Sequence, residues 1–261
     1  MIMADNNYWK RVAFRNSRGL TLAGLLYGSP EETGDIVIHC HGFTGSKEGG
    51  GRALELGAEL GRRGWSTLVF DFAGNGESEG DFADITLSGQ VDDLTCAVDW
   101  VLKQGYKRIV TVGRSFGGST VICQGARDPR VAGVCTWAAP ARLIDLFASF
   151  TGEPIDGPEE MVAIAGERGI IYLKKAFFQD LKIYDVPGDA ARLAPRPLLI
   201  IHGTRDGVVP PEDARLISDA AGEPRELAWI EEGDHQFAKH YHQVWKTLFY
   251  WLDKHFKRPV P

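Results

Sequence analysis

Short apolar runs alternate along the chain with segments in which apolar residues recur at helical spacing. Runs of this length that are bounded by glycine or proline are typical of buried strands, and a recurrence every three or four residues is typical of amphipathic helices. The pattern predicts buried strands at residues 35–40, 66–72, 108–113, 131–139, 197–203 and 226–231. It predicts helices at residues 52–63, 87–104, 119–127, 211–221 and 239–256, and an opening hairpin at residues 9–16 and 20–27.

This alternation predicts an α/β fold with a mostly parallel central sheet and helices on both faces. The pattern breaks between Pro140 and Pro187, where polar residues, patches of helical spacing and several aromatic residues replace the apolar runs. We interpret residues 141–187 as a small helical cap inserted over the carboxyl edge of the sheet, and an ordinary connecting pair of helices is the alternative. No repeat or linker divides the chain, so we expect residues 1–261 to form a single domain that carries this cap.

Composition narrows the classes of function. The chain has 261 residues, of which 44% are hydrophobic and 25% charged, and this is typical of a globular protein. The net charge of −6 and the lack of a Lys/Arg cluster argue against a nucleic-acid partner. No apolar run approaches the roughly 18 residues of a membrane span, and the first residues do not resemble a secretory leader. We therefore expect a cytoplasmic protein that has no membrane partner.

One turn organises the candidate chemistry. Residues 113–118 read G-R-S-F-G-G, and they follow the predicted strand at 108–113 and precede a predicted helix. Strand, small-residue turn and helix form the context in which G-x-S-x-G is a nucleophile elbow. The glycines leave room for a strained serine backbone, and the helix start directs N–H groups at an anion that forms on a substrate. Ser115 is therefore the predicted nucleophile.

A second G-x-S-x-G match occurs at residues 76–80, G-E-S-E-G. No strand leads directly into it, and the negative charges of Glu77 and Glu79 would oppose an oxyanion beside the hydroxyl of Ser78. We interpret Ser78 as a loop residue.

A serine hydroxyl needs a base that takes its proton, and the base needs a carboxylate that fixes its tautomer. Two loops that follow predicted strands offer these groups, Asp206 in the first loop and His235 in the second. Asp234 is the rival carboxylate, but it is adjacent to His235 in the sequence, so we expect its side chain to point elsewhere.

Five motifs in order make the chain resemble the α/β-hydrolases from about Ile36 to its end. They are the His-Gly-Phe turn at 41–43, the glycine loop at 71–78, the elbow at 113–118, the loop that holds Asp206 and the Gly-Asp-His turn at 233–235. Nucleophile, acid and histidine also occur in the order typical of this superfamily. The His-Gly-Phe turn and the short cap resemble those of small bacterial carboxylesterases, among them cinnamoyl and feruloyl esterases. Arg114 departs from that branch, where His or Gln more often precedes the nucleophile, and this difference concerns the acyl preference.

The resemblance implies a role for each matched residue. Ser115 is the expected nucleophile, His235 the general base and then acid, and Asp206 the orienting carboxylate. The backbone N–H groups of Phe43 and Phe116 are the expected oxyanion-hole donors.

Other polar residues have weaker expectations. Tyr172, Gln179 and Asp180 lie in the predicted cap and are candidates for contact with a phenolic hydroxyl of the substrate. Three histidines and four cysteines lack metal-ligand spacing, and we interpret them as structural histidines and buried free thiols (His39, His41, His202, Cys40, Cys96, Cys123, Cys135). The glycines at 74–76 lack the further glycine and the lysine of phosphate-binding loops, so no metal and no cofactor are expected.

The expected reaction is hydrolysis of a small-molecule carboxylic ester, with short acyl or aryl (cinnamoyl) groups, through an acyl-enzyme. An acyl-aminoacyl or prolyl-type peptidase, a thioesterase and an acyltransferase share the fold and remain alternatives. An inactive binding scaffold is the alternative that is not an enzyme. The sequence leaves open whether the chain forms a homodimer.

Overall fold

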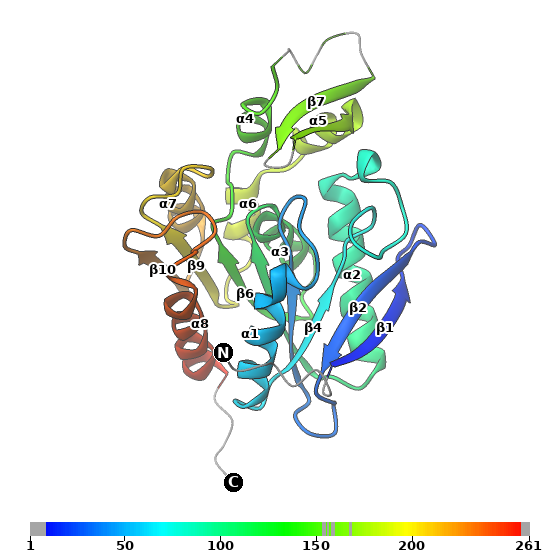
Figure 1. The fold of residues 1–261 in the computed structure, drawn as a ribbon. Coiled ribbons are helices and arrows are strands. Elements are labelled where there is room, and N and C mark those ends of the chain that lie inside the picture. Colours follow the sequence, from blue (N-terminus) through cyan, green and yellow to red (C-terminus); the bar gives the residue numbers. More distant parts are fainter. Residues whose placement is uncertain (1–8, 153–154, 156, 158–159, 167–168, 257–261) are drawn as a thin grey trace.

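An eight-stranded sheet in the order β1-β2-β4-β3-β5-β6-β9-β10 forms the centre of the protein (Figure 1). The structure is a computed structural model, and it describes residues 9–152, 155, 157, 160–166 and 169–256. The strands of this sheet are β1 (Trp9–Arg15), β2 (Thr21–Tyr27), β3 (Asp35–Cys40), β4 (Ser66–Phe70), β5 (Arg108–Arg114), β6 (Val131–Trp137), β9 (Leu198–Gly203) and β10 (Arg225–Ile230). The β1–β2 and β2–β4 pairs are antiparallel and the other pairs are parallel, which confirms the predicted α/β fold with a mostly parallel sheet.

The burial of the strands explains the two kinds of apolar pattern. Every residue of β3, β4 and β9 is buried, because helices cover both faces of the sheet where these strands lie. In β2, which lies nearer the edge of the sheet, buried positions alternate with half-buried ones. A continuous apolar run therefore marks a strand inside the sheet, and an alternating run marks a strand nearer its edge.

The helices cover the two faces of the sheet unequally. They are α1 (Arg52–Gly61), α2 (Leu87–Lys103), α3 (Phe116–Arg127), α4 (Leu143–Ala148), α5 (Lys175–Leu181), α6 (Val186–Ala191), α7 (Pro211–Ala220) and α8 (Tyr241–His255), with short 3₁₀ turns at Gly49–Gly51 and Phe82–Asp84. Buried side chains of α1 and α8 form one apolar core with the sheet, and those of α2, α3, α6 and α7 form the other. The sheet thus separates two cores, and both faces are covered as predicted.

Helix α3 begins at Phe116, directly after the candidate nucleophile, rather than at residue 119. Glycines at 117 and 118 lower helix propensity, so the sequence pattern indicates a later start. Glycine is nevertheless needed at both positions, because larger side chains would collide with neighbouring chain segments, as described for the site below.

The segment between β6 and β9 differs from the helical insertion that the sequence predicts. Besides α4, α5 and α6 it contains an antiparallel hairpin of β7 (Met161–Gly166) and β8 (Gly169–Lys174). Val162 and Ile164 are buried while their neighbours are exposed, so β7 has the two-residue period of a half-buried strand. In Figure 1, α4, β7 and α5 lie beyond the edge of the sheet at which the parallel strands end.

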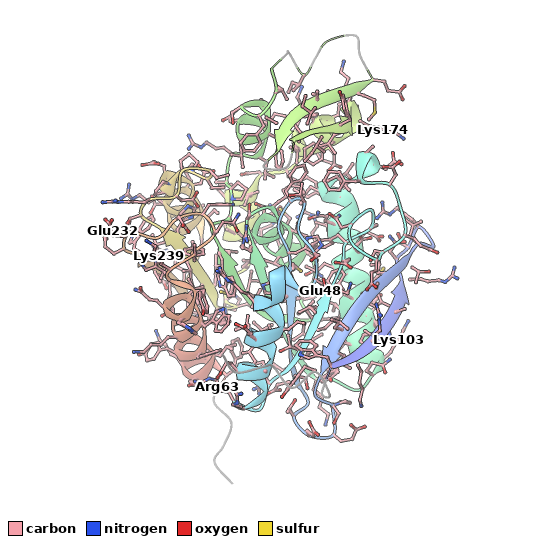
Figure 2. All side chains as sticks on the ribbon, viewed as in Figure 1. Glu48, Arg63, Lys103, Lys174, Glu232 and Lys239 are labelled. Atoms are coloured by element: carbon pink, nitrogen blue, oxygen red, sulfur yellow. The ribbon has the colours of Figure 1, made fainter. Side chains whose placement is uncertain are left out.

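The hairpin also contacts the main body of the protein through charged groups. Figure 2 places Lys174, the last residue of β8, on the side that faces the turn at Phe82–Asp84. Its ammonium lies 2.5 Å from the Asp84 carboxylate. Among the described residues, no helix has both the length and the apolar character that a membrane crossing requires.

Candidate active site

Ser115 lies in the turn between β5 and α3 in a strained backbone conformation, with φ 53° and ψ −125°. A residue with a side chain in such a region costs about 1–3 kcal/mol, so the surrounding structure has to enforce it. Added Cβ atoms would lie 2.1 Å from Gly117 O at Gly113 and 2.3 Å from His41 O at Gly117. Real Cβ atoms do not approach so closely, so only glycine fits at either position and the turn is held tight.

Hydrogen bonds join Ser115, His235 and Asp206 into one array. His235 Nε2 lies 3.1 Å from Ser115 Oγ, and His235 Nδ1 lies 2.8 Å from Asp206 Oδ2. A carboxylate can only accept, so Nδ1 carries the ring proton and the lone pair of Nε2 faces the serine hydroxyl. The structure therefore brings together the three side chains that the sequence assigned to catalysis.

The Asp206 carboxylate is buried but well supplied with donors. Its Oδ1 accepts from the N–H groups of Val208 and Val209, both at 2.9 Å. Burial alone would raise the pKa of Asp206, but the hydrogen bonds from His202 and His235 outweigh it and lower the pKa below its usual value. Asp206 is therefore ionised at neutral pH, as an orienting carboxylate requires.

His202 supports this carboxylate, and the sequence analysis interpreted it only as a structural histidine. Its Nε2 lies 3.0 Å from Val209 O and 3.3 Å from Asp206 Oδ2. Because a carbonyl oxygen only accepts, Nε2 carries the proton and can be shared between the two oxygens. The sequence signal was the four-residue spacing between His202, near the end of β9, and Asp206 in the loop that follows.

Backbone contacts between neighbouring strands bring the two loops together. β9 and β10 pair in parallel, and an added Cβ on Gly203 at the end of β9 would lie 2.2 Å from Gly233 O. Arg205 N also donates to Gly233 O at 3.0 Å. The rival carboxylate of Asp234 accepts instead from Ala238 N at 2.9 Å, so it is not the group bonded to His235.

The turn at Gly42 and Phe43 packs against the elbow. A Cβ on Gly42 would lie 3.2 Å from Ser115 Cβ, and the rings of Phe43 and Phe116 are 6.3 Å apart between centroids. His41 fixes the turn, because its Nε2 accepts from Phe72 N while Nδ1–H donates to Gly42 O at 2.8 Å.

The two predicted oxyanion donors lie at this contact. Within the described part of the chain, neither Phe43 N nor Phe116 N is paired with a backbone acceptor. Unpaired N–H groups beside a candidate nucleophile are what stabilisation of an oxyanion requires.

Comparisons with known proteins identify the family of the chain. Residues 31–152 match the family model described as Serine aminopeptidase, S33. The chain is 30% identical over 217 residues to the YfhR protein of Salmonella typhimurium, a match that covers 80% of this chain and 67% of that protein. The chain belongs to the α/β-hydrolase superfamily.

Solved structures show the same fold for this α/β-hydrolase. Est1E from Butyrivibrio proteoclasticus, solved with ferulic acid bound, has a TM-score of 0.83 at 22% identity and covers 95% of this chain and 100% of its own. The esterase domain of a Rhodothermus marinus protein has a TM-score of 0.73 at 22% identity, covering 94% of this chain and 98% of that domain.

The second G-x-S-x-G match has a structural explanation in this α/β-hydrolase. Ser78 Oγ donates to Asp71 O at 2.6 Å and accepts from Ala23 N at 2.9 Å, so the hydroxyl ties the loop to β2. Asp71 is fully buried, and Lys47 Nζ lies 2.7 Å from its carboxylate. This loop is part of the scaffold beneath the His-Gly-Phe turn.

The three cap residues singled out in the sequence are not bonded to the array. The Asp180 carboxylate accepts from the N–H of Ser88 at 2.9 Å and from its hydroxyl at 2.5 Å, so it holds α5 against the start of α2. Tyr172 on β8 is 56% exposed, and Gln179 is also exposed. Their contact with a substrate stays a prediction. Among the described residues, no group of three or more His, Cys, Asp or Glu side chains could hold a metal ion.

The contact between the elbow and the His-Gly-Phe turn generates a stability prediction. Gly117→Ala places a Cβ against His41 O, and we expect it to lower the free energy of unfolding by about 1–3 kcal/mol, the usual cost of overpacking. Urea denaturation measures this difference. Gly152→Ala is the matched control, because an added Cβ there meets nothing within 4 Å. Equal stability of the two variants would contradict the close packing.

Proposed function

We propose that this α/β-hydrolase cleaves carboxylic esters through an acyl-enzyme formed on Ser115. The observation that carries the proposal is the unbroken chain of hydrogen bonds from Ser115 Oγ through His235 to Asp206. A serine in a strained elbow, a histidine of fixed tautomer and an ionised carboxylate are together the parts of nucleophilic serine catalysis.

In the first half of the reaction, Ser115 Oγ attacks the ester carbonyl carbon while His235 Nε2 takes the hydroxyl proton. The carbonyl oxygen becomes an oxyanion that the N–H groups of Phe43 and Phe116 stabilise. The tetrahedral intermediate then collapses, the bond to the alcohol oxygen breaks, and the alcohol leaves with the proton from His235. The acyl group remains bonded to Ser115.

In the second half, water replaces the alcohol. His235 takes a proton from the water as it attacks the acyl carbon, and the same two N–H groups stabilise the second oxyanion. Collapse breaks the bond to Ser115 Oγ, which recovers its proton from His235, and the carboxylic acid is released. Asp206 stabilises the imidazolium that exists in both halves.

Aromatic side chains beside the elbow favour short acyl or aryl esters. The rings of Phe43, Phe116, Phe147 and Phe177 contact one another, with centroids between 4.8 and 6.3 Å apart. Phe147 belongs to α4 and Phe177 to α5, so this apolar cluster joins the elbow to the segment above the sheet. The ferulic acid bound to Est1E makes an aryl acyl group a suitable first substrate to test.

Related reactions on this fold remain candidates. The S33 family description favours a peptidase as the second candidate, since it rests on the part of the chain that contains Ser115. A thioesterase or an acyltransferase would use the same acyl-enzyme and would differ in the leaving or accepting group. The contacts among Ser115, His235 and Asp206 do not favour the alternative of an inactive binding scaffold, which would have no need of them.

A fluorophosphonate probe tests the nucleophile directly. We expect covalent labelling of the protein and none in Ser115→Ala, because the reagent reacts with an activated serine hydroxyl. Ser78→Ala is the matched control, because it removes the hydroxyl of the same motif from a serine whose hydrogen bonds are structural. Absence of labelling in the unmodified protein, shown by intact mass, would favour the scaffold.

Asp206→Asn tests the orienting carboxylate. An amide can present its NH₂ to His235 Nδ1 and reverse the tautomer, so we expect kcat for p-nitrophenyl acetate to fall by about 10⁴ with the fold retained. Circular dichroism checks the fold. Asp234→Asn is the control and should keep normal turnover. If the two variants had similar kcat values, the role would move to another carboxylate.

The identity of the scissile bond needs a paired measurement. We expect p-nitrophenyl esters and methyl ferulate to be hydrolysed at least 10²-fold faster, in kcat/KM, than a p-nitroanilide with the same acyl group, because the oxyanion chemistry is shared while the amine is the poorer leaving group. A series of acyl lengths from acetate to octanoate measures the size of the acyl site. Anilide cleavage at a comparable rate would favour the peptidase.

A further inference from the structure

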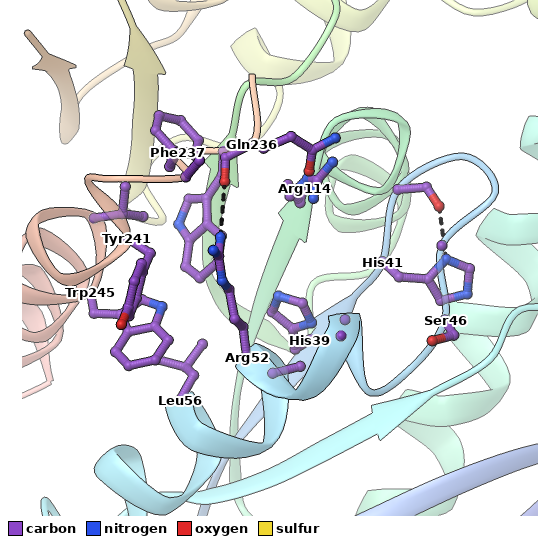
Figure 3. Close-up of a pocket in the computed structure, with 18 of the residues that line it drawn as sticks. His39, His41, Ser46, Arg52, Leu56, Arg114, Gln236, Phe237, Tyr241 and Trp245 are labelled. Carbon is purple, nitrogen blue, oxygen red and sulfur yellow. Dashed lines mark hydrogen bonds between the residues drawn. The ribbon is translucent and has the colours of Figure 1, made fainter. Parts of the chain in front are cut away.

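A cavity of about 450 Å³ lies beside the elbow (Figure 3). It is formed where α1, α8 and the loop after His235 meet the carboxyl ends of β3, β5 and β6. Its volume lies within the roughly 300–1,000 Å³ range of small-molecule sites. The buried ring of Trp245 and the buried side chain of Leu56 lie deep in it, whereas Arg52 and Gln236 are exposed at its rim.

The strands beneath the cavity change character as they reach it. On the face that α1 and α8 cover, Val37, Val110 and Cys135 belong to the apolar core. Two residues further along β3 the side chain is His39, and β5 and β6 end with Arg114 and Trp137, which pair across the ladder. Side chains two residues apart in a strand lie on the same face of the sheet. On this face, polar and aromatic side chains therefore follow the apolar ones toward the carboxyl edge of the sheet. These polar and aromatic groups line the cavity, where they can contact a ligand.

The charges that line the cavity have one sign. Arg52 and Arg114 both contribute to its wall, and no acidic side chain does so among the residues that the structure describes. Outside the lining, the carboxylates of Glu48, Asp71 and Glu77 share the ammonium of Lys47, at 3.1, 2.7 and 2.7 Å. A wall whose charged side chains are all positive favours an anion.

His39 adds a buried polar atom that has no partner. The side chain is 7% exposed, and its Nδ1 has no hydrogen-bond partner in the described structure. Burial lowers the pKa of His39 to about 3, and the charges of His41 and Arg114 act in the same direction. The ring is therefore neutral at neutral pH and keeps one N–H donor for a ligand.

Aromatic rings form the remaining walls. Trp137, Phe237, Tyr241 and Trp245 all line the cavity, and Tyr241 and Trp245 pack edge to face with centroids 5.1 Å apart. The Arg52 guanidinium lies over the Tyr241 ring, with its carbon 4.7 Å from the centroid. Flat walls of this kind pack well against a flat ligand, and the guanidinium is held near the mouth of the cavity.

We propose that this cavity binds an aryl carboxylate group carried by the substrate. That the ligand is a substrate rests on the proposed ester hydrolysis. The cavity adjoins the array, because Gly42 and Phe43 line it and Arg114 directly precedes Ser115. His235 is followed by Gln236 and Phe237, which line it as well. An ester held at Ser115 can therefore place a charged aromatic end in the cavity.

A matched pair of esters tests the preference for an anion. The leaving phenols of 4-acetoxybenzoate and 4-acetoxybenzamide differ only in a carboxylate or a carboxamide, and we expect kcat/KM to favour the carboxylate at least tenfold. This ratio should fall about tenfold in Arg52→Ala and in Arg114→Gln, because each loses a charge-assisted hydrogen bond to the ligand. The ratio cancels any effect of Arg114→Gln on Ser115 that both esters share.

Arg62→Ala is the matched control, since Arg62 follows the same helix and pairs at the surface with Glu59. It should leave both rates and their ratio unchanged. A ratio near one in the unmodified protein, or an unchanged ratio in both cavity variants, would overturn the proposal.

A binding measurement separates this inference from the proposed function. Calorimetry with 4-hydroxybenzoate and 4-hydroxybenzamide needs no turnover, and we expect the carboxylate to bind at least tenfold more tightly and to lose this advantage in Arg52→Ala. Arginine-dependent binding without hydrolysis of any ester would leave the cavity assigned and refute the hydrolase. Ester hydrolysis without binding of 4-hydroxybenzoate would do the reverse.

Discussion

Close approach of main-chain segments around Ser115 is the constraint on which the rest of the site depends. The Ser115 backbone occupies a conformation that side chains disfavour, and Gly113, Gly117 and Gly42 allow three chain segments to meet there without Cβ atoms. This contact fixes the position of Oγ and places Gly42 and Phe43 beside it. Backbone packing thereby sets the positions of the proposed nucleophile and oxyanion donors, and the contact of Gly203 with Gly233 brings the loop of the proposed base to them.

Electrostatic balance keeps the loops of the site in place. Asp206 and Asp71 are both buried carboxylates, and burial of a charge is costly unless donors surround it. Asp206 receives two backbone N–H groups and the rings of His202 and His235, whereas Asp71 receives Lys47 and backbone N–H groups. Each carboxylate therefore organises the loop that holds it, the first next to the base and the second beneath the His-Gly-Phe turn.

The sequence predicted those parts of the molecule whose structure is determined by residues close together in the chain. Buried strands leave continuous apolar runs, and the elbow leaves its glycines, so the sheet and Ser115 could be located from the pattern alone. The hairpin of β7 and β8 was not predicted, because its two-residue period spans only a few residues between glycine and proline. The hydrogen bonds of Asp180 with Ser88 were not predicted either, because no local pattern indicates a partner 92 residues away. The cavity was likewise invisible, since its walls come from segments that are distant in sequence.

The two G-x-S-x-G matches show why a motif acquires meaning only from its backbone. Around Ser78 the flanking residues Gly76 and Gly80 have φ values of 52° and 114°, and Gly76 packs against the Asp71 carboxylate. The serine itself has no positive φ, and its hydroxyl is used both as donor and as acceptor within the loop. Around Ser115 the positive φ falls on the serine, and its hydroxyl faces the one imidazole nitrogen that has a lone pair to accept its proton. Identical spacing thus produces a loop anchor in one place and a candidate nucleophile in the other, because strain and hydrogen bonds are distributed differently.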